Sequence, residues 1–214
     1  MSVQFYFPRR RFLCILGGSV LTFRPLQAQS PAEVLVAAIQ DGGKVIYLRH
    51  AATNQREVDT GRLGDRGGQR NLSADGIRQA ERLGDALRAL RVPLNEILAS
   101  PVFRARDTAE LAFGKEQIKI TMDLVADEYA GDHLKAMIDA TKRLLRTLPG
   151  PGMNRVLVAH RTPLEMATGR MFPDSVLPEG AMAVFLPGGT PQLLGTLTAE
   201  RVVRSAESRG ALRR

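Results

Sequence analysis

Three short segments carry the residues best suited to chemistry. Arg49-His50 ends an apolar run over 44–48, and His160 ends a second such run in Val-Leu-Val-Ala-His. Arg104 lies a few residues past a third run, within Ser-Pro-Val-Phe-Arg-Ala-Arg-Asp-Thr-Ala. A histidine beside an arginine at the end of a strand is placed to act as a nucleophile in an anion pocket. Strand ends that carry His, Arg and His therefore predict one site.

These residue types suit the transfer of a phosphoryl group. Its peripheral oxygens stay negatively charged throughout transfer, and the planar guanidinium groups of Arg49 and Arg104 are predicted to clamp them. A neutral His50 can attack phosphorus through one ring nitrogen while the other nitrogen donates to a backbone carbonyl. His160 is expected to donate a hydrogen bond to a phosphoryl oxygen that gains charge. This chemistry requires neither a metal nor a cofactor.

The segments that must position these residues alternate between strand and helix patterns. Strands are expected over 44–48, 96–99, 118–121 and 156–159, with a hairpin over 182–186 and 193–197. Helices are expected from Ser73 to about Leu90, from Ser100 onward, and over 132–148 and 163–168, with Ser73 and Ser100 as N-caps. Residues 51–71 lack periodicity and predict a long loop, and the arginine-rich tail from Glu200 is expected to be frayed or partly helical.

This alternation predicts the α/β class, as a three-layer α/β/α sandwich with a mostly parallel central sheet. No long linker or internal repeat divides residues 29–214, so one domain is expected. Ligands of such sheets bind beyond the carboxyl ends of the strands. The predicted site lies at that edge.

Residues 1–28 resemble a cleavable export signal. They contain arginines at 9, 10 and 11, a short apolar stretch over 12–23, and Leu-Gln-Ala as a cleavage site. Two arginines followed by any residue, Phe and Leu fit the twin-arginine type, which predicts a periplasmic or secreted protein with no stable membrane insertion after cleavage. The signal holds four of the 30 basic residues, none of the 22 acidic ones and the only cysteine, Cys14, so cleavage lowers the formal charge from +8 to +4 and removes the only thiol. No basic stripe interleaved with aromatic residues follows, so no nucleic-acid partner is expected.

The chain resembles the histidine phosphatase superfamily, also called phosphoglycerate mutase-like, and within it a small exported phosphatase. Four ordered segments carry the resemblance: Leu-Arg-His-Ala-Ala-Thr at 48–53, Leu-Ser-Ala-Asp-Gly-Ile-Arg-Gln-Ala at 72–80, the Ser-Pro segment at 100–109, and Val-Leu-Val-Ala-His at 156–160. The resemblance implies a phosphohistidine intermediate on His50. It also implies phosphate contacts from Arg49, Arg104 and His160, and no cofactor.

The chain departs from the family pattern at three positions. Ala51 and Ala159 replace the usual glycines after the first histidine and before the second. If either position needs a positive φ, alanine is disfavoured there. Arg161 stands where a small residue is common, and it either supplies a third cation for phosphate or points to solvent.

The sequence offers several candidates for the general acid and for accessory phosphate ligands. Asp127, Glu128 and Glu165 are candidates for the proton donor, although for Asp127 or Glu128 taken singly a solvated loop charge is the simpler explanation. Thr53 either binds phosphate or braces the loop, and Arg70 either reaches the phosphate or is solvated. We include Thr53 and Arg70 as predicted substrate-binding residues.

The leading interpretation is a phosphoric monoester hydrolase that is independent of metal. Its substrate would be a phosphorylated small molecule or a phosphoprotein. The alternative is a catalytically weak phosphate-binding or regulatory protein on the same fold, motivated by the uncertain acid and the two alanines. The sequence contains no motif that identifies the substrate or the oligomeric state.

Overall fold

The computed structural model describes residues 30–212, and the predicted export signal with Cys14 lies outside them. Six strands form one sheet in the order β3-β2-β4-β1-β5-β6. In chain order they are β1 (Val45–Arg49), β2 (Leu94–Ala99), β3 (Ile118–Ile120), β4 (Asn154–Ala159), β5 (Met182–Leu186) and β6 (Gln192–Leu197). Strands β3, β2, β4 and β1 are parallel, and β5 runs antiparallel to both β1 and β6. The expected mostly parallel sheet is confirmed.

Strand β1 lies in the middle of the sheet because its sequence suits burial on both faces. All five residues, Val-Ile-Tyr-Leu-Arg, are buried, and the strand pairs with β4 on one side and β5 on the other. A continuous run of apolar and β-branched residues is typical of a strand covered on both faces. The sheet therefore holds the end of β1, with Arg49 and His50, in a fixed position.

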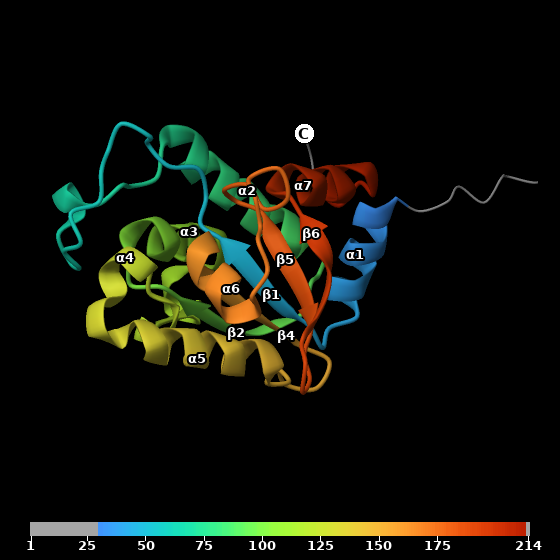
Figure 1. Ribbon diagram of the computed structural model, residues 1–214. Helices are drawn as coiled ribbons and strands as arrows, with labels where there is room; N and C mark the ends of the chain where they lie inside the picture. The colour runs from blue at the N-terminus through green and yellow to red at the C-terminus, as the bar shows by residue number, and fades with distance from the viewer. Residues whose placement is uncertain (1–29, 213–214) are drawn as a thin grey trace, which may run out of the picture.

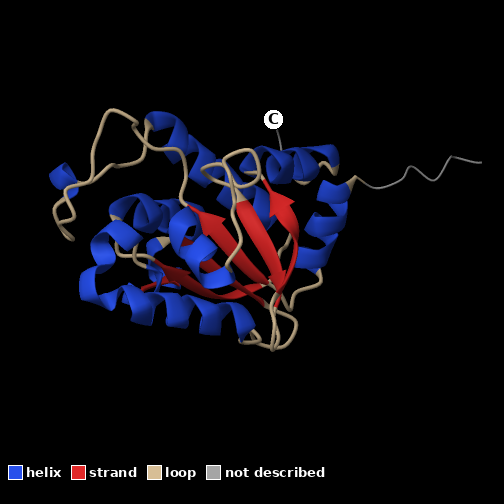
Figure 2. Ribbon diagram, viewed as in Figure 1, coloured by secondary structure: helices blue, strands red, loops and turns tan. Residues whose placement is uncertain are grey.

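Helices cover both faces of the sheet (Figures 1 and 2). The α-helices are α1 (Pro31–Gln40), α2 (Ala74–Ala89), α3 (Phe103–Phe113), α4 (Asp127–Ala130), α5 (Leu134–Arg146), α6 (Arg161–Thr168) and α7 (Ala199–Ser208). Short 3-10 helices are η1 (Arg66–Gly68), η2 (Lys115–Gln117), η3 (Met122–Leu124) and η4 (Gly131–His133). Over residues 30–212, no helix has both the length and the apolar character needed to cross a membrane.

Two apolar cores separate the three layers. Side chains of α1, α2, α3 and α7 pack on one face of the sheet, where β1 contributes Ile46 and Leu48. Side chains of α5 and α6 pack on the other face, where β1 contributes Val45 and Tyr47. Alternate residues of a strand point to opposite faces, so one strand supplies both cores. The predicted α/β/α sandwich is confirmed.

The loop between β1 and α2 extends away from the body of the molecule (Figure 1). Arg66 fastens it to α3, because its guanidinium donates to both carboxylate oxygens of Asp107 at 2.6 and 3.0 Å and lies 3.9 Å from the ring centroid of Phe103. Within the loop, Gln69 donates to the carbonyl of Arg62 and accepts from the amide of Phe103. The long irregular loop is as predicted, and its own polar contacts hold it in place.

One helix was not predicted from the sequence: α1, although Ser30 and Glu33 form a reciprocal capping box and proline occupies the first turn. The tail from Glu200, expected to be frayed or partly helical, is helical as far as Ser208 in α7, because Val202, Val203 and Ala206 bury one face of it. Charged residues in this segment occupy the opposite, exposed face.

The predicted ends of two helices were wrong. Helix α3 is capped at Val102 rather than at Ser100, whose hydroxyl accepts from the Val102 amide and also contacts His160. Leu148, the last residue of the helix predicted over 132–148, lies beyond the end of α5 at Arg146 and is 70% exposed. Helix α3 therefore begins later, and α5 ends earlier, than the sequence pattern suggests.

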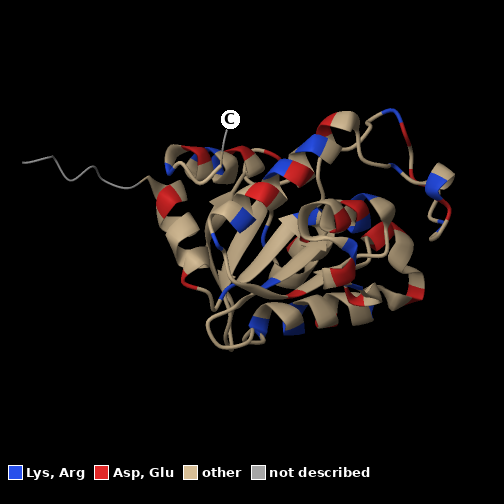
Figure 3. Cartoon of the chain, turned by 180° about the vertical axis from the view of Figure 1, so that it is seen from behind, with Lys and Arg blue, Asp and Glu red and all other residues tan. Residues whose placement is uncertain are grey.

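Basic and acidic side chains are mixed on the helices α2 and α7 (Figure 3). On α2, Arg78 pairs with Asp75 and Arg88 with Asp85, and Arg82 reaches Glu207 on α7 at 2.9 Å. These three arginines are more than half exposed, as expected of a solvated helix face.

Candidate active site

His50 and His160 leave the sheet side by side. Arg49 of β1 is in register with Ala159 of β4, and the next residue of each parallel strand is a histidine. The backbone amide of His50 donates to the carbonyl of Ala159 at 3.0 Å. The two imidazole rings lie 5.4 Å apart between centroids, at an angle of 53°. The structure thus brings together the two histidines that the sequence assigns to one site.

His50 is held as a neutral base with one defined tautomer. Its Nδ1 lies 2.9 Å from the carbonyl oxygen of Ala51, and a carbonyl can only accept, so Nδ1 carries the proton. Burial lowers the pKa of His50 well below its ordinary value, and the positive charge of Arg104 lowers it further. Nε2 makes no hydrogen bond to any residue between 30 and 212 and is not sealed from solvent. This nitrogen therefore keeps its lone pair available.

His160 contacts the protein through the other ring nitrogen. Its Nε2 lies 2.8 Å from the hydroxyl of Ser100, which already accepts from the amide of Val102 at 3.2 Å. Ser100 is fully buried, so its hydroxyl proton needs an acceptor, and Nε2 of His160 provides one. The ring proton then resides on Nδ1, which is buried and has no partner among the described residues. Burial lowers the pKa of His160 as well, with Arg104 as the next cause.

Arg49 supplies a buried guanidinium beside His50. Its Nη1 donates to Asp174 at 2.5 Å and to the carbonyl of Leu177 at 2.8 Å, and Nη2 lies 3.9 Å from Glu179. The Nε of Arg49 is buried and unpaired within residues 30–212. One edge of this guanidinium is therefore anchored by the protein, while Nε can still donate.

Arg70, a predicted substrate-binding residue, lines the same cavity as Arg49. The two arginines line one cavity of about 510 Å³, together with Arg161 and the carboxylates of Asp174 and Glu179. Nη2 of Arg70 lies 3.9 Å from Glu179, and its Nε is buried without a partner among the residues described.

Arg104 lies in the first turn of α3, and its side chain is 3% exposed. Its Nη1 donates to both carboxylate oxygens of Asp59 at 2.9 and 3.1 Å, and its Nη2 donates to Glu128 at 2.5 Å. Tyr129 donates a further hydrogen bond to Asp59 at 2.5 Å. Burial alone would raise the pKa of Asp59, but hydrogen bonds from Tyr129, the Arg70 amide and Arg104 outweigh burial and lower it. Without substrate, two carboxylates occupy both terminal nitrogens of Arg104.

The three candidates for the general acid have different surroundings. Burial raises the pKa of Asp127, and the adjacent carboxylate of Glu128 raises it further. Glu128 contacts Arg104 directly. Glu165 accepts from the amide of Phe172 at 2.7 Å and lies 4.0 Å from Nε of Arg161, so it braces the chain after α6. Of the three, Glu128 contacts Arg104 of the predicted phosphate clamp.

Thr53 braces the loop through Glu179. Its amide and hydroxyl donate to the two carboxylate oxygens of Glu179 at 2.9 and 2.8 Å, and it forms an isolated bridge with Leu72. The structure therefore shows a structural role for Thr53 and leaves the predicted phosphate contact untested.

The two alanines that replace family glycines cause no backbone strain. Among the described non-glycine residues only Arg91 has a positive φ, so neither Ala51 nor Ala159 needs the conformation that favours glycine. Ala51 is also fixed by its amide, which donates to Thr108 at 2.9 Å.

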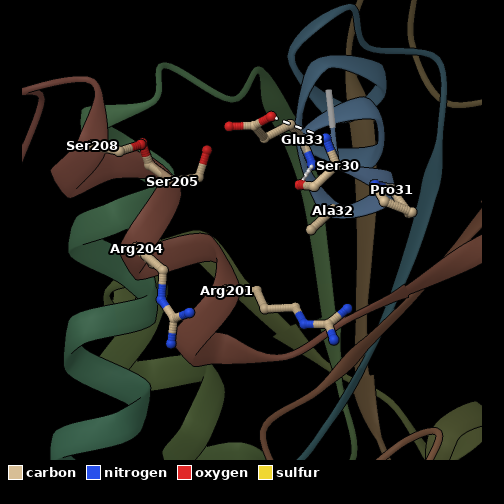
Figure 4. Close-up of a pocket in the computed structure, with 8 residues that line it drawn as sticks. All are labelled: Ser30, Pro31, Ala32, Glu33, Arg201, Arg204, Ser205 and Ser208. Carbon is tan, nitrogen blue, oxygen red and sulfur yellow. Dashed lines mark hydrogen bonds between the residues drawn. The ribbon is translucent and has the colours of Figure 1, made fainter. Parts of the chain in front are cut away.

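A second pocket, of about 420 Å³, lies between α1 and α7 (Figure 4). Its two arginines, Arg201 and Arg204, extend in different directions rather than toward one point. None of the residues that the sequence assigns to phosphoryl chemistry lines it. We therefore place the candidate site at the strand ends and not here.

Sequence reasoning missed several polar residues of the site. Ser100 carried a signal, because it stands directly after the second strand, but it was interpreted as a helix cap. Asp59, Asp174 and Glu179 lie in irregular segments, where no periodicity indicates which side chains turn toward the site. Tyr129 follows the two candidate acids and was not considered. In residues 30–212, no group of three or more His, Cys, Asp or Glu side chains is arranged to hold a metal ion.

A comparison with protein-family models matches residues 45–138 to the histidine phosphatase superfamily, branch 1. The matched segment includes Arg49, His50 and Arg104. Within residues 45–138 the chain is similar to the histidine phosphatase superfamily, branch 1. His160 lies beyond the matched segment, and the structure supplies the missing connection by placing it beside His50.

Several solved structures share the fold of this chain. A candidate alpha-ribazole-5′-P phosphatase from Escherichia coli is similar with a TM-score of 0.52 at 16% identity, covering 74% of this chain and 98% of that one. Rv3214 from Mycobacterium tuberculosis has a TM-score of 0.50 at 19% identity, covering 73% and 98%. A phosphoserine phosphatase from Entamoeba histolytica, solved with 3-phosphoglyceric acid, has a TM-score of 0.50 at 13% identity, covering 74% and 98%. No curated protein matches the sequence.

Proposed function

We propose that this protein is a phosphoric monoester hydrolase that forms a phosphohistidine on His50. The observation that carries the proposal is the state of the His50 ring, whose Nδ1 proton is held by the Ala51 carbonyl at 2.9 Å and whose Nε2 is open. A buried, neutral imidazole beside arginines is suited to attack an anionic phosphorus. The family match over residues 45–138 supports the same class of activity.

The proposed reaction has two displacements at phosphorus. In the first, Nε2 of His50 forms a bond to phosphorus, the bond from phosphorus to the ester oxygen breaks, and that oxygen takes a proton to leave as an alcohol. In the second, water attacks phosphorus, the bond to Nε2 breaks, and a proton from water returns to the acid. Arg49, Arg104 and the Nδ1 proton of His160 would stabilise the charge on the peripheral oxygens in both steps. Each step balances without an external oxidant or reductant.

We assign proton transfer to the carboxylate pair Asp127 and Glu128. Burial and the adjacent carboxylate of Glu128 raise the pKa of Asp127, which favours the protonated form that a proton donor needs, and Glu128 accepts a hydrogen bond from Arg104 at 2.5 Å. Glu165 is tied to Phe172 and Arg161 and has no part in this proposal.

The phosphoenzyme is the direct test of this function. Residues 29–214 would be purified, mixed with a radiolabelled phosphomonoester in the presence of a chelator, and quenched. We expect a labelled protein that loses its label in acid and keeps it in base, and His50→Ala should abolish both label and turnover. Undiminished turnover by His50→Ala would refute the nucleophile assignment.

One observation favours the alternative of a catalytically weak phosphate-binding protein. Both terminal nitrogens of Arg104 are engaged by Asp59 and Glu128, so phosphate must compete with carboxylates that are already in place. Phosphate binding measured by calorimetry, with no phosphoenzyme on any tested ester, would support this alternative and contradict the hydrolase.

We also propose that the protein is exported through its N-terminal segment. The support is the order of basic, apolar and small residues over 1–28. A reporter fused after residue 28 should be exported, and lysines in place of Arg9 and Arg10 should retain it in the cytoplasm if the signal is of the twin-arginine type. Export of the doubly substituted reporter at the original rate would exclude that type.

A further inference from the structure

Arg161 extends the cationic surface of the site beyond the phosphoryl position. It directly follows His160, as Arg49 directly precedes His50, and both arginines line the 510 Å³ cavity. The side chain of Arg161 is 33% exposed, against 10% for Arg49. The cavity therefore leads from a buried arginine beside the nucleophile to a more accessible one at its rim.

One carboxylate oxygen bridges these two arginines. Oδ1 of Asp174 lies 2.5 Å from Nη1 of Arg49 and 2.7 Å from Nη1 of Arg161. The Asp174 side chain is 71% exposed, so water competes for it and it can be displaced. Glu179 is different, because the amide and hydroxyl of Thr53 hold both of its oxygens and its side chain is only 16% exposed.

We propose that Arg161 and Nη1 of Arg49 bind a second anionic group of the substrate, which takes the place of Asp174. This inference rests on the proposed hydrolase function, because it assigns the phosphoryl group itself to the His50 side of Arg49. The buried Nε of Arg49 has no partner in the described part of the chain, and Nη2 lies 3.9 Å from Glu179, so these two nitrogens can donate to the phosphoryl oxygens. One guanidinium thus contacts both anions of the substrate.

The substrate class follows from the cavity wall. The preferred substrate is a small phosphomonoester whose alcohol carries a carboxylate or a second phosphoryl group a few bonds from the ester oxygen. Pro178 is the only described lining residue without a polar side chain, so this wall has no aromatic ring on which a nucleoside base could stack. A guanidinium pairs with a carboxylate or a phosphate through the same planar fork.

The test compares matched substrates that differ in one group. Residues 29–214 would be assayed with phosphoglycolate, ethylene glycol bisphosphate, ethyl phosphate and phosphoethanolamine. Hydrogen bonds to charged groups lead us to expect kcat/KM about tenfold to hundredfold higher for the two substrates with a second anion than for ethyl phosphate. Arg161→Gln should reduce that ratio about tenfold or more, and Asp174→Asn should lower the KM for phosphoglycolate.

Two further variants make the result specific. Arg170→Gln removes an exposed arginine outside the cavity and should leave the ratio unchanged. Arg161→Lys keeps the charge without the planar fork and should give an intermediate ratio, which also covers the case in which Arg161→Gln fails to fold. An unaltered ratio in Arg161→Gln, or a preference for phosphoethanolamine, would overturn the inference.

Failure of the hydrolase proposal would look different. No turnover of any of the four compounds would contradict the hydrolase, and the second-anion site would then be tested by calorimetric binding of phosphoglycolate and ethyl phosphate. Tighter binding of phosphoglycolate that is lost in Arg161→Gln would support the site, whereas equal affinities would overturn it.

Discussion

Substitution of Ser100 by alanine isolates the control that the protein exerts over His160. The hydroxyl of Ser100 is fully buried and serves two neighbours at once, accepting from the amide of Val102 at 3.2 Å and contacting Nε2 of His160 at 2.8 Å. The substitution removes a single oxygen and adds no atoms. It changes the hydrogen bonding of the second histidine without deleting that histidine.

The expected cost to stability follows from the two groups left without a partner. A buried polar group that loses its hydrogen bond costs about 1–3 kcal/mol, so the two groups together should lower the free energy of unfolding of Ser100→Ala by roughly 2–6 kcal/mol. For a domain of this size, each kcal/mol corresponds to about 2–4 °C in Tm, which predicts a decrease of roughly 4–24 °C. The protein should still be folded at 25 °C.

The expected cost to activity follows from the tautomer of His160. With the hydroxyl absent, nothing holds the ring proton on Nδ1, and the donor proposed for the phosphoryl oxygen is present in only part of the molecules. Removal of a donor from a preorganised anion site costs about a hundredfold to a thousandfold in kcat, so partial loss should cost roughly tenfold to a hundredfold.

The assay measures urea unfolding and steady-state turnover on the same samples at 25 °C. Ser73→Ala is the matched control, because its hydroxyl accepts from the Gly76 amide at the start of α2 and lies outside the site. It should cost about 1 kcal/mol of stability and leave kcat/KM unchanged. If Ser100→Ala loses the expected stability but keeps kcat/KM within about twofold of the wild type, the tautomer argument is refuted.

Three further predictions concern stability, phosphate affinity and pH. Asn154→Ala should lower the free energy of unfolding by about 3 kcal/mol in urea, because its buried amide bonds to Lys44, Ile39 and Pro93; a loss under 1 kcal/mol would contradict this. Asp59→Asn should lower the inhibition constant of inorganic phosphate about threefold to tenfold, because it frees Arg104 to bind phosphate. Asp65→Asn, at an exposed position of the same loop, should leave that constant unchanged. Equal effects of the two substitutions would refute the competition between Asp59 and phosphate for Arg104. Burial depresses the folded-state pKa of His50 and His160, so their contribution to stability is present above the unfolded value of about 6.5 and is lost as the pH falls below it. Unfolding at a series of pH values should show this slope, and replacing both histidines by glutamine should reduce it; an unchanged slope would point to other groups.

The strand ends could be predicted because sequence pattern and topology agree there. Continuous apolar runs identify β1 and β4, and parallel neighbours carry their last residues to the same edge of the sheet. The sequence alone therefore brought His50 and His160 together. It could not give the register of the strands, which decides that Arg49 pairs with Ala159 and that the two rings are neighbours.

The errors in the fold came from giving composition more weight than local signals. The capping box at Ser30 and Glu33 indicates the start of α1, but it stands directly after the predicted export signal, where no helix was expected. In α7, the charges of Arg201 and Arg204 left both a frayed and a partly helical tail open, and Val202 and Val203 decide for the helix because they bury one face of it. Amphipathic spacing in a short segment is a weak signal when most of its residues are charged.

The carboxylates of the site could not be placed from the sequence, and their physical role explains why they matter. Four arginines lie near the two neutral histidines: Arg49, Arg70, Arg104 and Arg161. Each of these arginines has a carboxylate within 4 Å. Without these carboxylates the clustered positive charges would repel one another and destabilise the folded state. Phosphate must replace these carboxylates to reach the guanidinium groups. The affinity for substrate is therefore set by how much more strongly the arginines bind phosphate than they bind the carboxylates.

The exposure of each carboxylate then sets the order in which the substrate can replace it. Asp174 has a side chain 71% exposed and contacts only arginines, so its departure leaves no other group unpaired. Asp59 is 17% exposed and also serves Tyr129 and the Arg70 amide, so moving it leaves several buried donors unsatisfied. An anion should therefore displace Asp174 first and reach Arg104 only at a higher cost. A substrate with two anionic groups can contact Arg161 before its phosphoryl group competes for Arg104. The second anion should therefore raise kcat/KM, because its binding energy helps to offset the cost of displacing Asp59.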